Sequence, residues 1–106
     1  MTADRAIQND TVKWRGVLIE ITYEVSWLSI DRPGDRAVAH LTVTAIEPKR
    51  ARLPITETGF RSRFLDPAEV DGEGGPVAYV AAWLDAMSRS QDWLEYEQSR
   101  RQLSLF

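Results

Sequence analysis

Residues 17–27 read VLIEITYEVSW, and this stretch decides the fold. Large apolar side chains occur at every second position from Val17 to Trp27, with mainly glutamate, threonine and serine between them. A period of two places all of these apolar side chains on one face of an extended chain. The stretch therefore predicts a long antiparallel strand that buries one face and leaves the other mainly polar.

The segments that follow predict a sheet around this strand. Residues 31–35, DRPGD, combine a proline that fixes φ with a glycine that permits positive φ, and they predict a turn. Residues 37–46 are rich in β-branched side chains and predict a second strand, paired back as a hairpin. Residues 60–64, FRSRF, alternate phenylalanine with arginine. We expect a further strand there, with the phenylalanines inside and the arginines outside.

The pattern changes in the last third of the chain. Residues 66–69, DPAE, predict a helix start, with the aspartate as N-cap and proline at the first position. About one turn fits before a glycine-rich loop at residues 71–75. Residues 76–87 and 91–101 then carry apolar side chains at helical spacing. This order indicates an α+β fold: an antiparallel β-sheet in the first two-thirds, with C-terminal helices packed on one face.

Composition sets the outer limits of this prediction. A chain of 106 residues, 43% of them hydrophobic, predicts a single domain over residues 1–106. Residues 1–11 are polar and aperiodic, and we expect them to be disordered. The chain has no cysteine, and we find no signal-peptide core or membrane-spanning stretch, so we expect no membrane contact and a cytoplasmic location. A net charge of −3 argues against general coating of nucleic acid, although residues 49–63 hold five basic residues and one acid, a local charge of +4.

Residues 102–106, QLSLF, gather three large apolar side chains. An exposed apolar cluster usually marks a contact surface. The string resembles the peptide with which bacterial replication and repair proteins dock on the DNA polymerase sliding clamp. In that family the glutamine enters a small polar pocket, and the leucine and the Leu-Phe pair enter a hydrophobic cleft. The resemblance implies that the partner is bound by Gln102, Leu103, Leu105 and Phe106.

Other arrangements of these residues stay open. They could pack back on the sheet as a final strand or helical turn, or complete a homodimer. Two features favour the docking peptide. The polar, basic residues 98–102 interrupt the apolar face of the preceding helix, and the alternation of Leu103 and Leu105 is typical of an extended segment. We therefore call residues 102–106 the docking tail.

The basic segment suggests a second function. Guanidinium groups and small hydroxyls are what a phosphate or carboxylate site needs. This alternative is a module that binds DNA or a phosphoryl ligand through Arg50, Arg52, Arg61 and Arg63. A solvated arginine ladder beside Glu57 is the competing interpretation. Residues 53–64, with 74–80 and 83–84, resemble small uncharacterised bacterial proteins from plasmids and phages, a resemblance that implies no activity.

The sequence favours a binding protein over an enzyme. His40 is the sole histidine and has no cysteine as a co-ligand, so neither a metal site nor a Ser-His-Asp triad is supported. Glu20 and Glu24 share one face of the predicted strand, where two like charges fit a solvated surface better than an acid–base pair. We therefore expect no catalytic residue, no metal and no cofactor.

Overall fold

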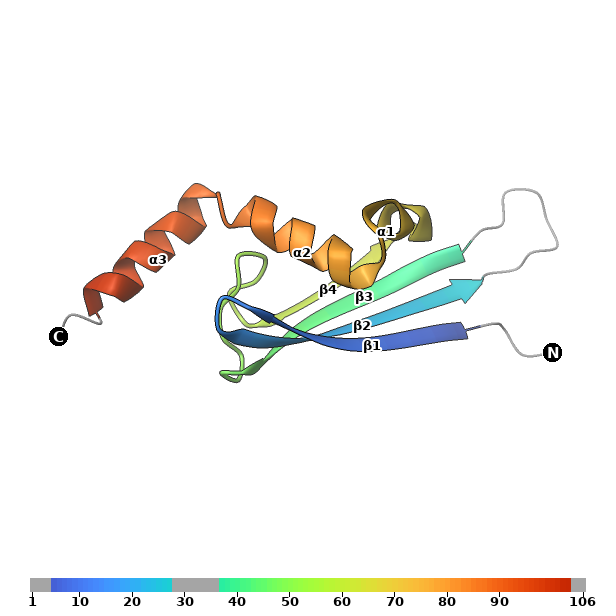
Figure 1. The fold of residues 1–106 in the computed structure, drawn as a ribbon, viewed down its shortest axis with the longest axis horizontal. Coiled ribbons are helices and arrows are strands. Elements are labelled where there is room, and N and C mark those ends of the chain that lie inside the picture. The colour runs from blue at the N-terminus through green and yellow to red at the C-terminus, as the bar shows by residue number, and fades with distance from the viewer. Residues whose placement is uncertain (1–4, 28–36, 104–106) are drawn as a thin grey trace.

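The computed structural model describes residues 5–27 and 37–103, so the turn predicted at residues 31–35 lies outside the described residues. The elements in chain order are β1 (Arg5–Trp14), β2 (Val17–Trp27), β3 (Ala37–Glu47), β4 (Phe60–Leu65), α1 (Pro67–Glu73), α2 (Pro76–Met87) and α3 (Gln91–Leu103). The strands form one antiparallel sheet in the order β1-β2-β3-β4. In Figure 1, α1 and α2 lie over one face of this sheet, and α3 extends past its end. The predicted α+β class is confirmed, although α3 does not cover the sheet as the other helices do.

The core lies between the sheet and the first two helices. Ile19, Ile21 and Tyr23 of β2 are buried on the covered face, directly opposite Ala45, Val43 and Leu41 of β3. Buried side chains from the helices close this layer: Val70 of α1 and Val80 and Leu84 of α2. The period-two pattern of residues 17–27 therefore identifies the buried face correctly.

The N-terminal strand is a correction to the sequence analysis, which expected residues 1–11 to be disordered. From Arg5 onward the chain pairs with β2 along the whole of β1. A tight turn joins the two strands, and both of its residues, Arg15 and Gly16, have positive φ, at 47° and 84°, as a type I′ hairpin turn requires. Val12 and Trp14 of this edge strand pack against the core, whereas residues 7–9 are exposed. Because Ile7 lies in the opposite phase to Val12 and Trp14, the apolar side chains of β1 follow no single period that could be read from the sequence.

The orientation of β4 is the second correction, because its phenylalanines point outward. Arg61 and Arg63 lie opposite Val43 and Leu41, which places them on the helix-covered face. Their guanidinium carbons lie over the ring of Trp83, 5.6 Å and 4.9 Å from its centroid. Leu65 is buried in the core, and because side chains alternate along a strand, Arg61 and Arg63 share its face while the phenylalanines lie on the other face. At the margin of the sheet, arginine stems cover apolar surface while their charged heads stay in water.

The helix starts follow their local chemistry. The Oδ1 atom of Asp66 accepts a hydrogen bond of 2.9 Å from the backbone N–H of Ala68, and Pro67 occupies the first turn, as predicted. α1 continues through Gly72 to Glu73, so the expected loop at residues 71–75 shrinks to Gly74 and Gly75. α3 includes the polar stretch at residues 98–102, which was expected to interrupt only its apolar face, and it continues to Leu103.

Gly16 and Gly59 have nearly equal φ but different surroundings. Alanine substitutions at these two positions therefore distinguish the effect of backbone strain from that of steric clash. Gly16 (φ 84°) has open space where a Cβ would be, whereas a Cβ on Gly59 (φ 80°) would lie 2.5 Å from the Cα of Arg50. We expect Gly16→Ala to lower the free energy of unfolding by about 1–2 kcal/mol through left-handed strain alone. Gly59→Ala should lower it by about 1–3 kcal/mol more, because the backbone of residue 50 must move. Urea denaturation of both variants measures the difference, and equal losses would contradict this packing.

Tyr23 gives a prediction about alkaline stability. Burial, with smaller contributions from the carboxylates of Asp71 and Asp66, raises the pKa of the Tyr23 hydroxyl. Its buried oxygen has no hydrogen-bond partner within the described part of the chain. We expect Tyr23→Phe to change stability at neutral pH by less than about 1 kcal/mol. The parent should lose stability above about pH 10, as the pH rises towards the raised pKa of the folded state, because the unfolded tyrosine ionises first. Thermal melts between neutral and alkaline pH should show a smaller alkaline loss in Tyr23→Phe.

Candidate functional site

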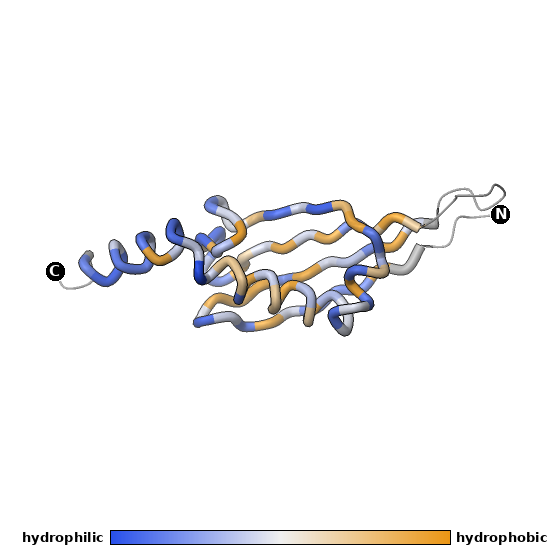
Figure 2. Tube along the Cα trace, turned by 90° about the horizontal axis from the view of Figure 1, so that it is seen from above, coloured by the Kyte–Doolittle hydropathy of each residue, from blue (hydrophilic) through white to orange (hydrophobic). Residues whose placement is uncertain are grey.

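The end of α3 stands away from the body of the domain. Figure 1 shows the helix leading outward from the end of the sheet, and Figure 2 shows that its outer part is mainly hydrophilic. Residues 98–102 are all exposed. Only the first part of the helix is apolar enough to pack, so α3 carries the start of the docking tail outward.

Aromatic contacts fix the base of α3. Trp93 is 3% exposed, and its ring centroid lies 5.8 Å from that of Trp14 and 5.1 Å from that of Tyr96. The guanidinium carbon of Arg52 lies 4.4 Å from the centroid of the Tyr96 ring, which is a cation–π geometry. These contacts join α3 to the β1–β2 hairpin and to the loop before β4.

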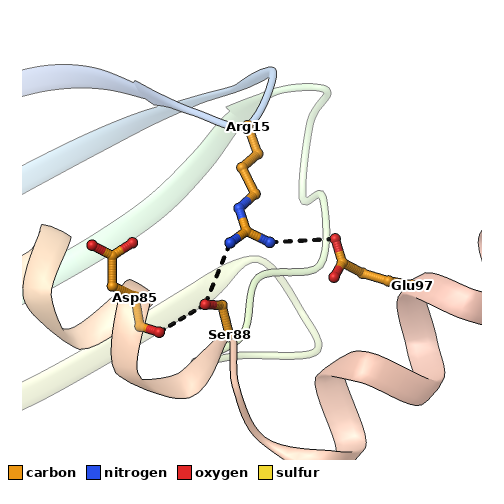
Figure 3. Close-up of polar contacts among 4 residues, drawn as sticks. All are labelled: Arg15, Asp85, Ser88 and Glu97. Atoms are coloured by element: carbon orange, nitrogen blue, oxygen red, sulfur yellow. Dashed lines mark hydrogen bonds and ion pairs between the residues drawn. The ribbon is translucent and has the colours of Figure 1, made fainter.

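A polar node strengthens the same junction (Figure 3). The Nη1 atom of Arg15 lies 3.5 Å from a carboxylate oxygen of Glu97, and its Nη2 donates to the hydroxyl of Ser88 at 3.5 Å. That hydroxyl donates in turn to the backbone carbonyl of Asp85 at 2.7 Å. One side chain at the tip of the hairpin thus contacts both the end of α2 and the second turn of α3.

The docking tail is described only in part. Gln102 is exposed in the last turn of α3, and Leu103 is the final residue of that helix. Leu105 and Phe106 lie outside the described residues. The helix runs two residues beyond the predicted end at residue 101. The first two positions of the tail are therefore helical in the isolated chain rather than extended.

The structure distributes the four arginines of the second hypothesis over three places. Arg61 and Arg63 lie together over Trp83. Arg52 is half-buried against Tyr96, and its guanidinium lies 3.6 Å from the carboxylate of Glu57. Arg50 is exposed in the preceding loop, where it lines a hollow of about 650 Å³ beside the first residue of β4.

The sheet face away from the helices carries a cluster that the sequence analysis missed. Phe60 and Phe64 are 48% and 71% exposed on this face. The ring of His40 stacks on that of Phe64 with centroids 4.5 Å apart and an interplanar angle of 18°. The Nε2 atom of His40 lies 2.6 Å from the hydroxyl oxygen of Ser62, within hydrogen-bond distance. The cluster could have been predicted from the position of Leu65. If Leu65 faces the core, the alternation of side chains along the strand places Phe60, Ser62 and Phe64 on the opposite face.

Two kinds of feature are absent from residues 5–27 and 37–103. These residues contain no group of three or more histidines or carboxylates placed to hold a metal ion. They also contain no helix long and apolar enough to cross a membrane.

The one-sided antiparallel sheet with its protruding final helix defines a small two-layer α+β domain. The chain belongs to the KlcB third domain family, whose model matches residues 7–93. The match runs from β1 to the first turn of α3 and ends before the docking tail. Neither the search of curated proteins nor the search of solved structures gave a match.

The polar node generates a prediction about the mobility of α3. We expect Arg15→Asn to speed amide hydrogen exchange in α3, because the link from the hairpin to Glu97 is lost. Global stability should change by less than about 1 kcal/mol, because the ion pair is exposed and asparagine tolerates positive φ. Arg50→Asn is the matched control, since Arg50 also has positive φ (58°) but lies outside the node. Equal exchange rates in α3 of both variants would show that the node does not hold the helix.

Proposed function

We propose that this protein is a non-enzymatic binding protein that docks on the bacterial DNA polymerase sliding clamp through Gln102, Leu103, Leu105 and Phe106. The main support for this proposal is the pentapeptide QLSLF, which agrees with the clamp-docking peptide at each of these four positions. In this role the protein acts as a replication or repair accessory, or as an inhibitor that blocks polymerase access, for a mobile element.

The position of α3 supports the proposal. Glu97 is the last helical residue tied to the hairpin by the polar node. Gln102 is five residues further on, which corresponds to about 7–8 Å along a helix axis. The family match ends at residue 93, so the docking peptide lies outside the matched residues. The tail can therefore enter a cleft on another protein without rearrangement of the core.

The energetics favour a weak, reversible contact. Burial of two leucines and a phenylalanine contributes about 1.5–3 kcal/mol each. Ordering of five residues costs about 1 kcal/mol or more per residue in backbone entropy, and the helical turn at Gln102 and Leu103 must unwind to reach an extended form. The net gain of a few kcal/mol corresponds to a dissociation constant in about the millimolar range for the tail alone. A second contact or tethering to DNA would then raise the effective affinity.

The alternative functions keep specific support. Binding of DNA or a phosphoryl ligand is favoured by the exposure of Arg50, Arg61 and Arg63. A homodimer completed by the tail is the third candidate, and light scattering on a chain that ends at residue 101 tests it directly. The clamp proposal ranks first because it accounts for a specific sequence of five residues rather than for charge or apolar character alone.

The test is a titration of labelled protein with purified clamp, followed by fluorescence anisotropy. We expect Leu105→Ala/Phe106→Ala to weaken binding at least 100-fold, because two of the three apolar side chains that enter the hydrophobic cleft are truncated. A synthetic QLSLF peptide should compete with the parent protein for the clamp.

Leu94→Ala serves as the matched control. Leu94 is also a large apolar side chain of α3, 49% exposed, but it lies outside the docking tail. This variant should bind the clamp like the parent. Equal binding by all three proteins, or no binding by any of them, would refute the proposal.

A further inference from the structure

We propose that the uncovered face of the sheet at β4 is a binding site for single-stranded nucleic acid, with bases stacked on Phe60 and Phe64. This aromatic platform comprises Phe60, Phe64, His40 and Ser62. It is separate from the docking tail and does not depend on clamp binding. It also gives the alternative function of nucleic-acid binding a defined site.

The exposure of the two phenylalanines is the first argument. The register places Phe60, Ser62 and Phe64 opposite Thr44, Thr42 and His40, on the face that α1 and α2 do not cover. Two large aromatic rings on a polar sheet face cost solvation free energy unless a ligand covers them. Aromatic side chains on an open antiparallel sheet are a recurring way to bind unpaired bases, because every base has a flat π-face.

The geometry of the rings is the second argument. Phe60 and Phe64 are four residues apart on one strand, which corresponds to about 13 Å, so they can hold two different bases of one strand. His40 covers one face of the Phe64 ring by its near-parallel stack, and the hydroxyl of Ser62 lies within hydrogen-bond distance of the imidazole. These contacts fix the orientation of the Phe64 ring before a ligand arrives, and a base would stack on the other face of the ring.

The distribution of charge is the third argument, and it indicates which kind of ligand binds the aromatic platform. Lys49 and Arg50 line the hollow beside Phe60, and Arg61 and Arg63 are exposed along the same edge strand. On the uncovered face of β2, by contrast, the register places the acidic side chains Glu20 and Glu24. A polyanion is therefore attracted to the β4 border and repelled from the middle of the sheet. We infer that the strand of nucleic acid runs along β4.

A second copy of this chain fits the border less well. Antiparallel pairing of β4 with itself would bring Arg61 and Arg63 of one copy close to the same arginines of the other. Like charges at directly opposed strand positions are destabilising. Charged side chains on an edge strand also commonly serve to prevent this kind of self-pairing. The basic border thus favours an anionic ligand over self-association.

The experiment measures anisotropy of labelled oligothymidylate and oligouridylate of about fifteen nucleotides at low salt, with the full-length protein. A duplex of the same length is the third probe, because its bases cannot reach the platform. We expect both single strands to bind more tightly than the duplex, and the ratio of the two affinities shows whether DNA or RNA is preferred. Phe64→Ala and Phe60→Ala should each weaken single-strand binding by about 5-fold to 100-fold, with no change in charge.

Ile7→Ala is the matched control. Ile7 is 58% exposed, and the register places it on the same sheet face at the opposite border, on β1. This variant should bind single strands like the parent, as should Leu105→Ala/Phe106→Ala, which separates the platform from the clamp proposal. Circular dichroism checks that each variant is folded.

Three results would overturn the platform. The first is no binding of either single strand at low salt. The second is binding that is equal in the parent, Phe60→Ala and Phe64→Ala, because it would then be electrostatic only. The third is self-association in sedimentation velocity that requires Phe64 and occurs without affinity for an oligonucleotide, which would identify a second copy as the occupant.

Discussion

The pairing of β2 with β3 is the constraint on which the rest of the structure depends. It aligns Ile19, Ile21 and Tyr23 with Ala45, Val43 and Leu41, so that two neighbouring strands present one continuous apolar face. The period of a strand is two, and a slip by one residue would turn this whole set towards solvent. α1 and α2 cover that face, and the opposite face is left without a helix among the described elements. Both candidate surfaces follow from this one-sided arrangement.

Sequence reasoning succeeds where burial is periodic or where a local interaction dominates. The alternation of β2 identifies the core face, and the cap at Asp66 identifies the start of α1. It fails at the edges of the sheet for a physical reason. In β1 the exposed Ile7 lies in the opposite phase to the partly buried Val12 and Trp14, so the sequence shows no single apolar period, and residues 1–11 were interpreted as disordered. In β4 the apolar character of the phenylalanines suggested burial, although the strand has only Leu65 to pack inward.

The two candidate sites differ in how much of each could be predicted from the sequence. The docking tail was proposed from its residues alone, because the resemblance to the clamp-docking peptide rests on side chains that are read directly from the sequence. Its setting was not predictable: that α3 leaves the sheet depends on Trp14, Arg15 and Arg52, which are distant in sequence from Trp93, Glu97 and Tyr96. The aromatic platform was not found from sequence, because it exists only once the β3–β4 register is known.

The orientation of β4, that is, which of its side chains face the helices, links the stability of this edge strand to its proposed ligand binding. When Leu65 faces the core, Arg61 and Arg63 must face the helices, where the ring of Trp83 accepts their guanidinium groups. The same choice forces Phe60 and Phe64 outward, beside Lys49 and Arg50. The opposite phase would bury two phenylalanines but expose Leu65, and it would move both arginines away from Trp83. The cost of two exposed rings is thus partly offset within the fold, and a ligand that covers them buries the apolar area that the fold leaves exposed.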